Sequence, residues 1–114
     1  MEYAVLTYER PGYNADFSED ERRAITGEYM EIAKHPACRG GAALQSIDTA
    51  TTVRVDGGEA IVTDGPFANT KEVFAGYFVF EADNLDPVLE IAGKIPAVRF
   101  GGAVEVRPVW ELPS

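Results

Sequence analysis

The chain has 114 residues, 46% of them hydrophobic and 25% charged, which is typical of a single globular domain spanning residues 1–114. With 10 basic and 19 acidic residues its formal net charge is −9, which disfavours direct binding to nucleic acid or to an anionic membrane surface. No apolar run approaches the length of a membrane span, and Met1 leads directly into a strand-like pattern without a signal peptide, so we expect a cytoplasmic protein.

The first expected elements are a strand and a helix. Residues 3–8 are apolar on both faces of the strand, which predicts a central position in a sheet. Ser18 and Glu21 form an S-x-x-E capping box, so a helix is expected to begin near Glu19 and to end before Pro36. Its apolar side chains repeat at helical spacing and predict a buried stripe: Ile25, Tyr29, Ile32 and Ala33.

The middle of the chain reads as strands joined by tight turns. A short strand is expected over residues 42–46, and the run Asp56-Gly57-Gly58 predicts a hairpin between residues 51–55 and 60–63. Gly65 and Pro66 then end the second hairpin strand and hold Asp64 at its end. Phe67 follows this turn and is expected to anchor it in the core.

Residues 73–80 are the most strand-like run in the sequence. Simple alternation places four of their side chains on one face, namely Phe74, Gly76, Phe78 and Phe80, and Tyr77 on the other. Gly76 leaves room on the aromatic face for a close neighbour.

A second helix and a last strand complete the pattern. Asp86 is the expected N-cap and Pro87 the first helical residue of a helix that ends before Pro96. The buried stripe of this helix is expected to contain Val88, Ile91, Ala92 and Ile95. In the last strand Val104 and Val106 face one way, and Glu105, Arg107 and Val109 face the other.

The order strand, helix, strands, helix, strand predicts an α+β fold, with an antiparallel sheet that carries both helices on one face in the ferredoxin-like manner. The other face of the sheet is then left open. Its expected side chains are partly polar: Arg54, Tyr77, Glu105 and Arg107. A symmetric dimer that stacks two such sheets would cover this face.

One functional hypothesis is a small-molecule enzyme or binding protein. Asp64 would act as general base or hydrogen-bond acceptor, since a carboxylate between low-dielectric walls can be tuned to a useful pKa. Lys71, Arg99 and Arg107 would hold an anionic group, with Tyr77 on the wall.

Each of these residues also has a structural interpretation. Asp64 can cap the turn, and Lys71 can be a solvated side chain. Arg107 can pair with Glu105 or with an acid from a neighbouring strand, and Arg99 can close the negative end of the second helix.

Other reactive side chains are few. His35 is the single histidine and Cys38 the single cysteine, and we expect structural roles for both. With scattered acids they match no zinc or iron ligand spacing, so neither a metal nor another cofactor is expected.

The residues around the hairpin carry a resemblance to a known family. The run Asp64-Gly65-Pro66-Phe67 followed by Thr70-Lys71-Glu72 resembles the signature of the DGPF group within the YCII-related (YciI-like) family. Further matching segments extend over nearly the whole chain: residues 3–6, 50–55, 76–78, 95–99 and 104–109. Asn69 stands where the family pattern leads us to expect an acidic residue.

The resemblance implies a homodimer with the architecture of a dimeric α+β barrel, which places a partly polar cavity for a small polar or anionic ligand between two sheets. Members of the wider family resemble enzymes that use a His-Asp pair, but this chain has no histidine at a matching sheet position, so that mechanism does not carry over. The alternative is a regulatory module, because DGPF proteins resemble partners of extracytoplasmic-function sigma factors.

Overall fold

The computed structural model describes residues 1–112. Its elements in chain order are β1 (Glu2–Glu9), α1 (Glu19–Ala33), β2 (Cys38–Ala43), a 3-10 turn (Ile47–Thr49), β3 (Thr51–Asp56), β4 (Glu59–Asp64), β5 (Val73–Glu81), α2 (Leu85–Ala92), α3 (Pro96–Arg99) and β6 (Ala103–Pro108).

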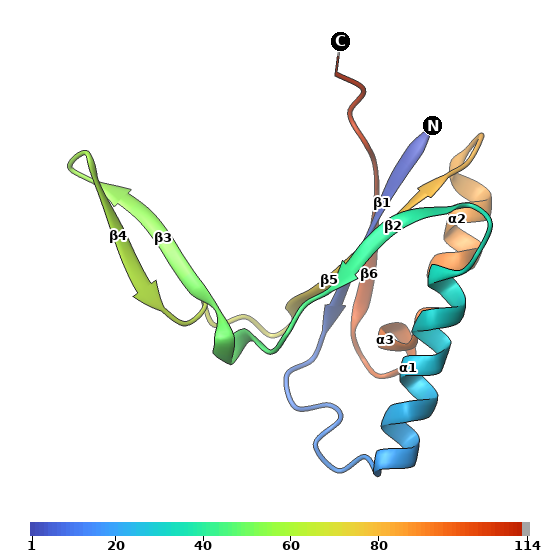
Figure 1. Ribbon diagram of the computed structural model, residues 1–114, viewed down its shortest axis with the longest axis horizontal. Coiled ribbons are helices and arrows are strands. Elements are labelled where there is room, and N and C mark those ends of the chain that lie inside the picture. The colour runs from blue at the N-terminus through green and yellow to red at the C-terminus, as the bar shows by residue number, and fades with distance from the viewer. Residues whose placement is uncertain (113–114) are drawn as a thin grey trace.

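Four strands form an antiparallel sheet in the order β2-β5-β1-β6. The three helices lie together on one side of this sheet, which leaves the other side, here called the outer face, without a covering layer (Figure 1). This arrangement is consistent with the predicted ferredoxin-like α+β fold and with the predicted central position of β1. No helix in residues 1–112 is both long and apolar enough to cross a membrane.

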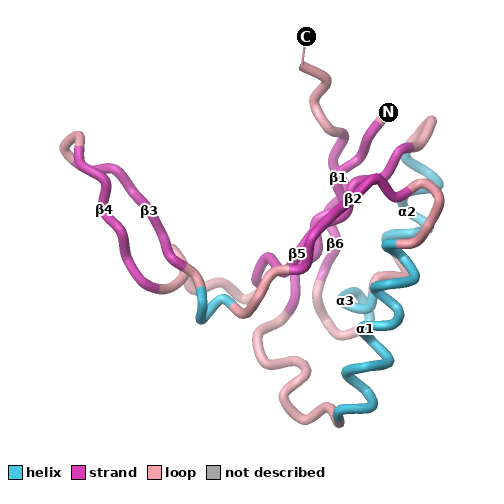
Figure 2. The backbone as a smooth tube through the Cα atoms, viewed as in Figure 1, coloured by secondary structure: helices cyan, strands magenta, loops and turns pink. Residues whose placement is uncertain are grey.

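The remaining two strands pair only with each other and project away from the body (Figures 1 and 2). We call this hairpin, residues 51–64, the arm. Its turn is the predicted one, because Gly57 and Gly58 both take positive φ angles of 58° and 84°, as a tight turn of this kind requires.

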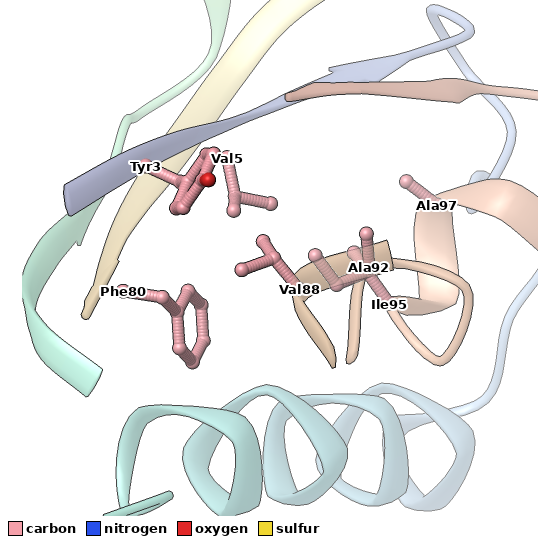
Figure 3. Close-up of a cluster of buried hydrophobic side chains, with 7 residues drawn as sticks. All are labelled: Tyr3, Val5, Phe80, Val88, Ala92, Ile95 and Ala97. Carbon is pink, nitrogen blue, oxygen red and sulfur yellow. The ribbon is translucent and has the colours of Figure 1, made fainter. Parts of the chain in front are cut away.

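The hydrophobic core lies between the sheet and the two short helices (Figure 3). Its buried side chains come from β1, β5, α2 and the segment around α3: Tyr3, Val5, Phe80, Val88, Ala92, Ile95 and Ala97. Burial of each large apolar side chain contributes about 1.5–3 kcal/mol, so this cluster fixes α2 and α3 on the sheet.

Helix α1 begins as the capping box predicts and packs more loosely. The Ser18 hydroxyl accepts the Glu21 N–H at 3.1 Å, and the Glu21 carboxylate accepts the Ser18 N–H at 3.2 Å. No residue of α1 is fully buried, although Tyr29 and Ile32 pack against the core. The helix therefore covers the sheet without sealing it.

Two predicted boundaries were wrong. Strand β2 is formed by residues 38–43 rather than 42–46, because it pairs with β5 from Cys38 opposite Phe80 to Ala43 opposite Gly76. The N-cap of α2 is Asn84, whose side chain accepts the Asp86 N–H at 3.1 Å, so the helix starts before the expected Asp86. The second helix ends before Pro96 as predicted, and Pro96 opens a further helix, α3, as its first residue.

Three predicted side-chain positions were also wrong. Phe74 lies beside Tyr8, with ring centroids 5.6 Å apart, because a register shift between Thr7 and Tyr8 takes it off the face of Gly76 and Phe78. Phe67 is 74% exposed and anchors nothing in the core. Arg54 lies on the arm rather than on the outer face of the sheet.

Candidate functional site

The five residues predicted for a ligand site lie in different parts of the structure. Asp64 is the last residue of the arm, and Lys71 is exposed in the loop before β5. Tyr77 and Arg107 both lie on the outer face. Tyr77 pairs with Leu6 and Arg107 pairs with Ala4, and Ala4 and Leu6 point to the same side of β1. Arg99 belongs to α3 on the helix side. The single chain therefore does not bring these five residues together.

Arg99 is committed to a structural contact. Its guanidinium donates two hydrogen bonds to the Glu28 carboxylate, one of them 2.9 Å long, and its carbon lies 4.7 Å from the centre of the Phe100 ring. Hydrogen bonding from Arg99 lowers the pKa of Glu28. This exposed pair connects α3 to α1. Arg99 therefore does not interact with the negative C-terminal end of α2, which was one interpretation of the sequence.

His35 is also held locally. Its Nδ1 accepts the Ala37 N–H at 3.0 Å, and its ring meets Phe80 edge-on with centroids 6.1 Å apart. Within residues 1–112 no group of three or more His, Cys, Asp or Glu side chains is placed to hold a metal ion.

A cavity of about 490 Å³ lies between α1 and the half of the sheet formed by β1, β5 and β2, and we call it the α1 cavity. Small residues create it. Its walls include a run in β2 with no side chain larger than a methyl group, together with small residues from the neighbouring elements: Gly40, Gly41, Ala42, Ala43, Gly76 and Ala33.

Two glycines allow the strands behind the cavity to approach closely. A Cβ on Gly76 would lie 2.7 Å from the Ala42 carbonyl oxygen, and one on Gly41 would collide with the Tyr77 carbonyl. Gly41 also has a φ of 155°, which L side chains rarely adopt. The room that the sequence suggested beside Gly76 is thus taken by the backbone of β2.

Two residues of the cavity wall, Thr7 and Tyr29, carry buried hydroxyl oxygens with no full hydrogen bond among the described residues, although the Ala97 backbone acts on Tyr29 as a weak donor. Thr7 is 3% exposed and its Oγ1 is buried, and the Tyr29 hydroxyl oxygen is buried as well. A buried hydroxyl without a partner costs about 1–3 kcal/mol.

Glu9 adds an ionisable group to the same wall. Burial raises the pKa of its carboxyl, and the nearby Tyr13 hydroxyl acts in the opposite direction as a hydrogen-bond donor. Burial, assisted by the negative charge of Glu9, raises the pKa of Tyr29 to about 12. Tyr29 therefore stays protonated at neutral pH, and Glu9 holds its proton to higher pH than an exposed glutamate does.

The sequence did not predict that Thr7, Glu9 and Tyr29 would lie together beside a cavity. Thr7 occupies an inward position of an otherwise apolar strand face, and four consecutive small residues follow α1 closely. Those two signals together indicate a gap with a polar wall, but neither tells which side of the sheet the helix covers. Of the predicted site residues only Tyr77 also borders the α1 cavity, although its pairing with Leu6 directs its side chain to the outer face.

Comparison with known proteins gives one family and one fold. A family model described as the YCII-related domain matches residues 1–113. An uncharacterized protein of Rhizobium meliloti (strain 1021) is 38% identical over 128 aligned positions that cover 100% of both chains.

Among solved structures, the chain is similar to 5-chloro-2-hydroxyhydroquinone dehydrochlorinase from Burkholderia phenoliruptrix AC1100 in complex with 2,5-dihydroxybenzoquinone. The match has a TM-score of 0.52 and 16% sequence identity, and covers 97% of this chain and 94% of the other. At this identity the similarity supports the fold.

Proposed function

The chain belongs to the YCII-related family, and from that premise we propose that it binds a small hydroxylated molecule in the α1 cavity. The observation that carries the proposal is a largely apolar cavity whose wall includes Thr7 and Tyr29, two residues with buried hydroxyls that make no full hydrogen bond among the described residues. Buried polar groups in proteins are nearly always paired, so an unpaired set at a cavity wall favours a ligand.

The dimensions and chemistry of the cavity indicate a class of ligand. A volume of about 490 Å³ is within the range of small-molecule sites. Its wall is largely apolar, with hydroxyls from Thr7 and Tyr29 and the carboxyl of Glu9, which suits a ring-sized molecule bearing hydroxyl or carbonyl groups. The dehydrochlorinase with the same fold is named for acting on such a molecule, which supports this choice as an analogy.

Glu9 gives the site a means of proton transfer. Burial raises the pKa of the Glu9 carboxyl, which makes it better suited than an exposed glutamate to exchange a proton with a bound molecule. We propose Glu9 as the acid/base group if the bound molecule is transformed.

Asp64, predicted for that role from the sequence, lies on the arm outside this cavity. A ligand-binding role for Asp64, Lys71 and Arg107, with an anionic molecule at an interface between two copies, remains a prediction for the outer face. The dimeric barrel remains a prediction for the same face, and exposed aromatic side chains there, such as Tyr77 at 38%, favour a covering partner.

The alternative function, an interaction module associated with extracytoplasmic-function sigma factors, also remains a prediction. The net charge of −9 suits a basic partner, and no other feature of residues 1–112 favours it. A pull-down of a sigma factor that is unaffected by Asp64→Asn would support this alternative.

The binding proposal is tested by isothermal calorimetry with 2,5-dihydroxybenzoquinone and 4-hydroxybenzoate as probes. Thr7→Val and Tyr29→Phe each remove one hydroxyl at nearly constant volume and should weaken binding about fivefold, since one hydrogen bond contributes about 1 kcal/mol. Thr7→Val should also stabilise the free protein, because it removes an unpaired buried hydroxyl.

Matched controls are Thr63→Val on the arm and Tyr3→Phe in the core, which should leave affinity unchanged. If both probes bind all four variants as they bind the wild type, the α1 cavity is not their site. If Thr7→Val destabilises the free protein, its hydroxyl has a structural partner and the main observation behind the proposal fails.

A further inference from the structure

The deepest part of the α1 cavity is closed to solvent. Thr7 is only 3% exposed, and the hydroxyl oxygens of Thr7 and Tyr29 are both buried. A molecule that arrives from solvent cannot form a hydrogen bond with a buried oxygen unless part of the cavity wall moves first. Ligand binding to these two residues therefore requires an opening of the α1 cavity.

Helix α1 is the wall that the core does not hold. It lines the cavity with Tyr29, Met30 and Ala33. None of the seven core side chains comes from α1, and no residue of α1 is fully buried (Figure 3). A second cavity, of about 590 Å³, lies between α1 and α2. Elements with few buried apolar contacts are those that open locally, so α1 is the wall best able to move.

The C-terminal end of α1 is fixed to the sheet. The Glu81 N–H of β5 donates to the Ala37 carbonyl at 2.9 Å, and the Cys38 N–H donates to the His35 carbonyl, also at 2.9 Å. The His35 ring meets Phe80 of the core edge-on. These contacts make the segment after α1 a fixed point about which the helix can turn.

Near its N-terminus α1 is joined to the loop that precedes it. The Arg22 guanidinium donates to the Asn14 carbonyl at 2.6 Å. The loop in turn packs the rings of Tyr13 and Phe17 on Phe100, with centroids 5.6 Å and 5.2 Å from that ring. Phe100 directly follows α3, so the loop and the helix meet the rest of the molecule at the end of α3.

One ion pair joins the middle of α1 to the same place. Arg99, which lies over the Phe100 ring, donates two hydrogen bonds to the Glu28 carboxylate. Among the ion pairs of residues 1–112 it is the one that joins α1 to another element. The side chains of Arg99 and Glu28 are 49% and 44% exposed, so water and salt compete with the pair and it can break while the fold stays intact.

From these observations we propose that α1 is a gate of the α1 cavity, which turns about residues 34–37 and is held closed by the Glu28–Arg99 pair. Opening moves Tyr29 and Met30 away from the sheet and exposes Thr7, and the pair re-forms once the molecule is bound. Arg99 does not line the cavity, so it acts on the ligand through α1 alone. This inference rests on the proposed function, because a gate is needed only if a ligand enters the cavity.

Thiol labelling of the ligand-free protein tests whether the wall opens. In a Cys38→Ala background, which removes the native thiol, Thr7→Cys places a thiol behind α1 and Val5→Cys places one in the core. With methyl methanethiosulfonate, Thr7→Cys should be labelled roughly tenfold faster or more than Val5→Cys, because α1 opens without global unfolding. Thr63→Cys, exposed on the arm, gives the rate of an open thiol and should be labelled fastest.

Two results of this experiment would overturn the gate. Equal labelling rates for Thr7→Cys and Val5→Cys, with the same dependence on urea, would show that only global unfolding exposes Thr7. A rate for Thr7→Cys equal to that of Thr63→Cys would show that no wall has to move.

The role of the ion pair is tested in the Thr7→Cys, Cys38→Ala protein. Arg99→Gln should speed labelling about threefold at low salt, because the closed state loses an exposed ion pair that the open state lacks. In about 1 M salt this difference should vanish, because salt screens the pair. The matched control is Arg23→Gln, which removes the same charge from a pair within α1 and should leave the rate unchanged. Equal effects of Arg99→Gln and Arg23→Gln, or no effect of either, would overturn the role of the pair.

Binding kinetics separate the gate from the proposed function. In the protein with its native Thr7 and Cys38, Arg99→Gln should speed both association and dissociation of 2,5-dihydroxybenzoquinone about threefold relative to Arg23→Gln, with the Kd unchanged. A higher Kd with an unchanged association rate would instead make Arg99 a ligand contact and overturn its role in the gate. If the probe binds none of these proteins while the labelling results hold, the proposed function fails for this probe and the gate stands.

Discussion

Thr7, Tyr29 and Glu9 all line the α1 cavity, and the hydroxyl oxygens of Thr7 and Tyr29 are buried. The three side chains come from two elements, β1 and α1, and each is polar at a position where the surroundings are mainly apolar. Such a set costs stability in the free protein, which is a common property of binding sites. The pH dependence of stability measures that cost directly.

Glu9→Gln tests the carboxyl. Because burial raises the pKa of Glu9 in the folded state, the folded protein binds this proton more tightly than the unfolded chain. The stability of the wild type should therefore fall as pH rises from about 4, the usual range of glutamate, through the raised pKa of Glu9. Glu9→Gln should melt at a higher temperature than the wild type at pH 7, and this difference should vanish near pH 4.

The control is Glu59→Gln, which makes the same charge change at an exposed position on the arm. A melting difference for Glu9→Gln that is the same at pH 4 and pH 7 would show that Glu9 carries no burial cost. The measurement is a thermal melt in a series of buffers of constant ionic strength.

At the scale of elements, the arm and α1 are the two parts that the core does not hold. The core joins β1 and β5 to α2 and α3, whereas α1 contributes no fully buried residue and the arm none. The arm depends instead on its base, where Gly65 closes the hairpin with a φ of 98°.

Gly65→Val should lower the free energy of unfolding by roughly 1–3 kcal/mol, because a β-branched residue is strained at this backbone angle. No atom lies within 4 Å of a Cβ at this position, so the effect would come from the backbone alone. Urea denaturation measures the difference. Gly27→Ala in α1, which also has open space around it, is the matched control and should stabilise by roughly 0.5–1 kcal/mol. Equal midpoints for Gly65→Val and the wild type would contradict the role assigned to this glycine.

At the scale of the whole molecule, the regular elements followed from local sequence signals. The capping box at Ser18, the glycines of the arm turn and the alternation in β6 each act over a few residues, so sequence alone predicted them. The ferredoxin-like order also followed, because it depends on the sequence of elements.

The α1 cavity could not be predicted from local sequence signals. The α1 cavity exists because β2 pairs with β5 over Cys38–Ala43 and places small residues opposite α1, a consequence of strand register. Phe67 illustrates the same limit, since its exposure follows from the direction of the arm, which Gly65 and Ala50 set through a contact 15 residues apart.

The most direct test of the proposed function is to map the binding of 2,5-dihydroxybenzoquinone by amide chemical shifts on the isotope-labelled protein. The account predicts that the perturbed amides are those around the α1 cavity, namely Thr7, Glu9, Tyr29, Gly41 and Gly76. Perturbations confined to the arm and to the outer face around Arg107, with the amides of the α1 cavity unchanged, would contradict it.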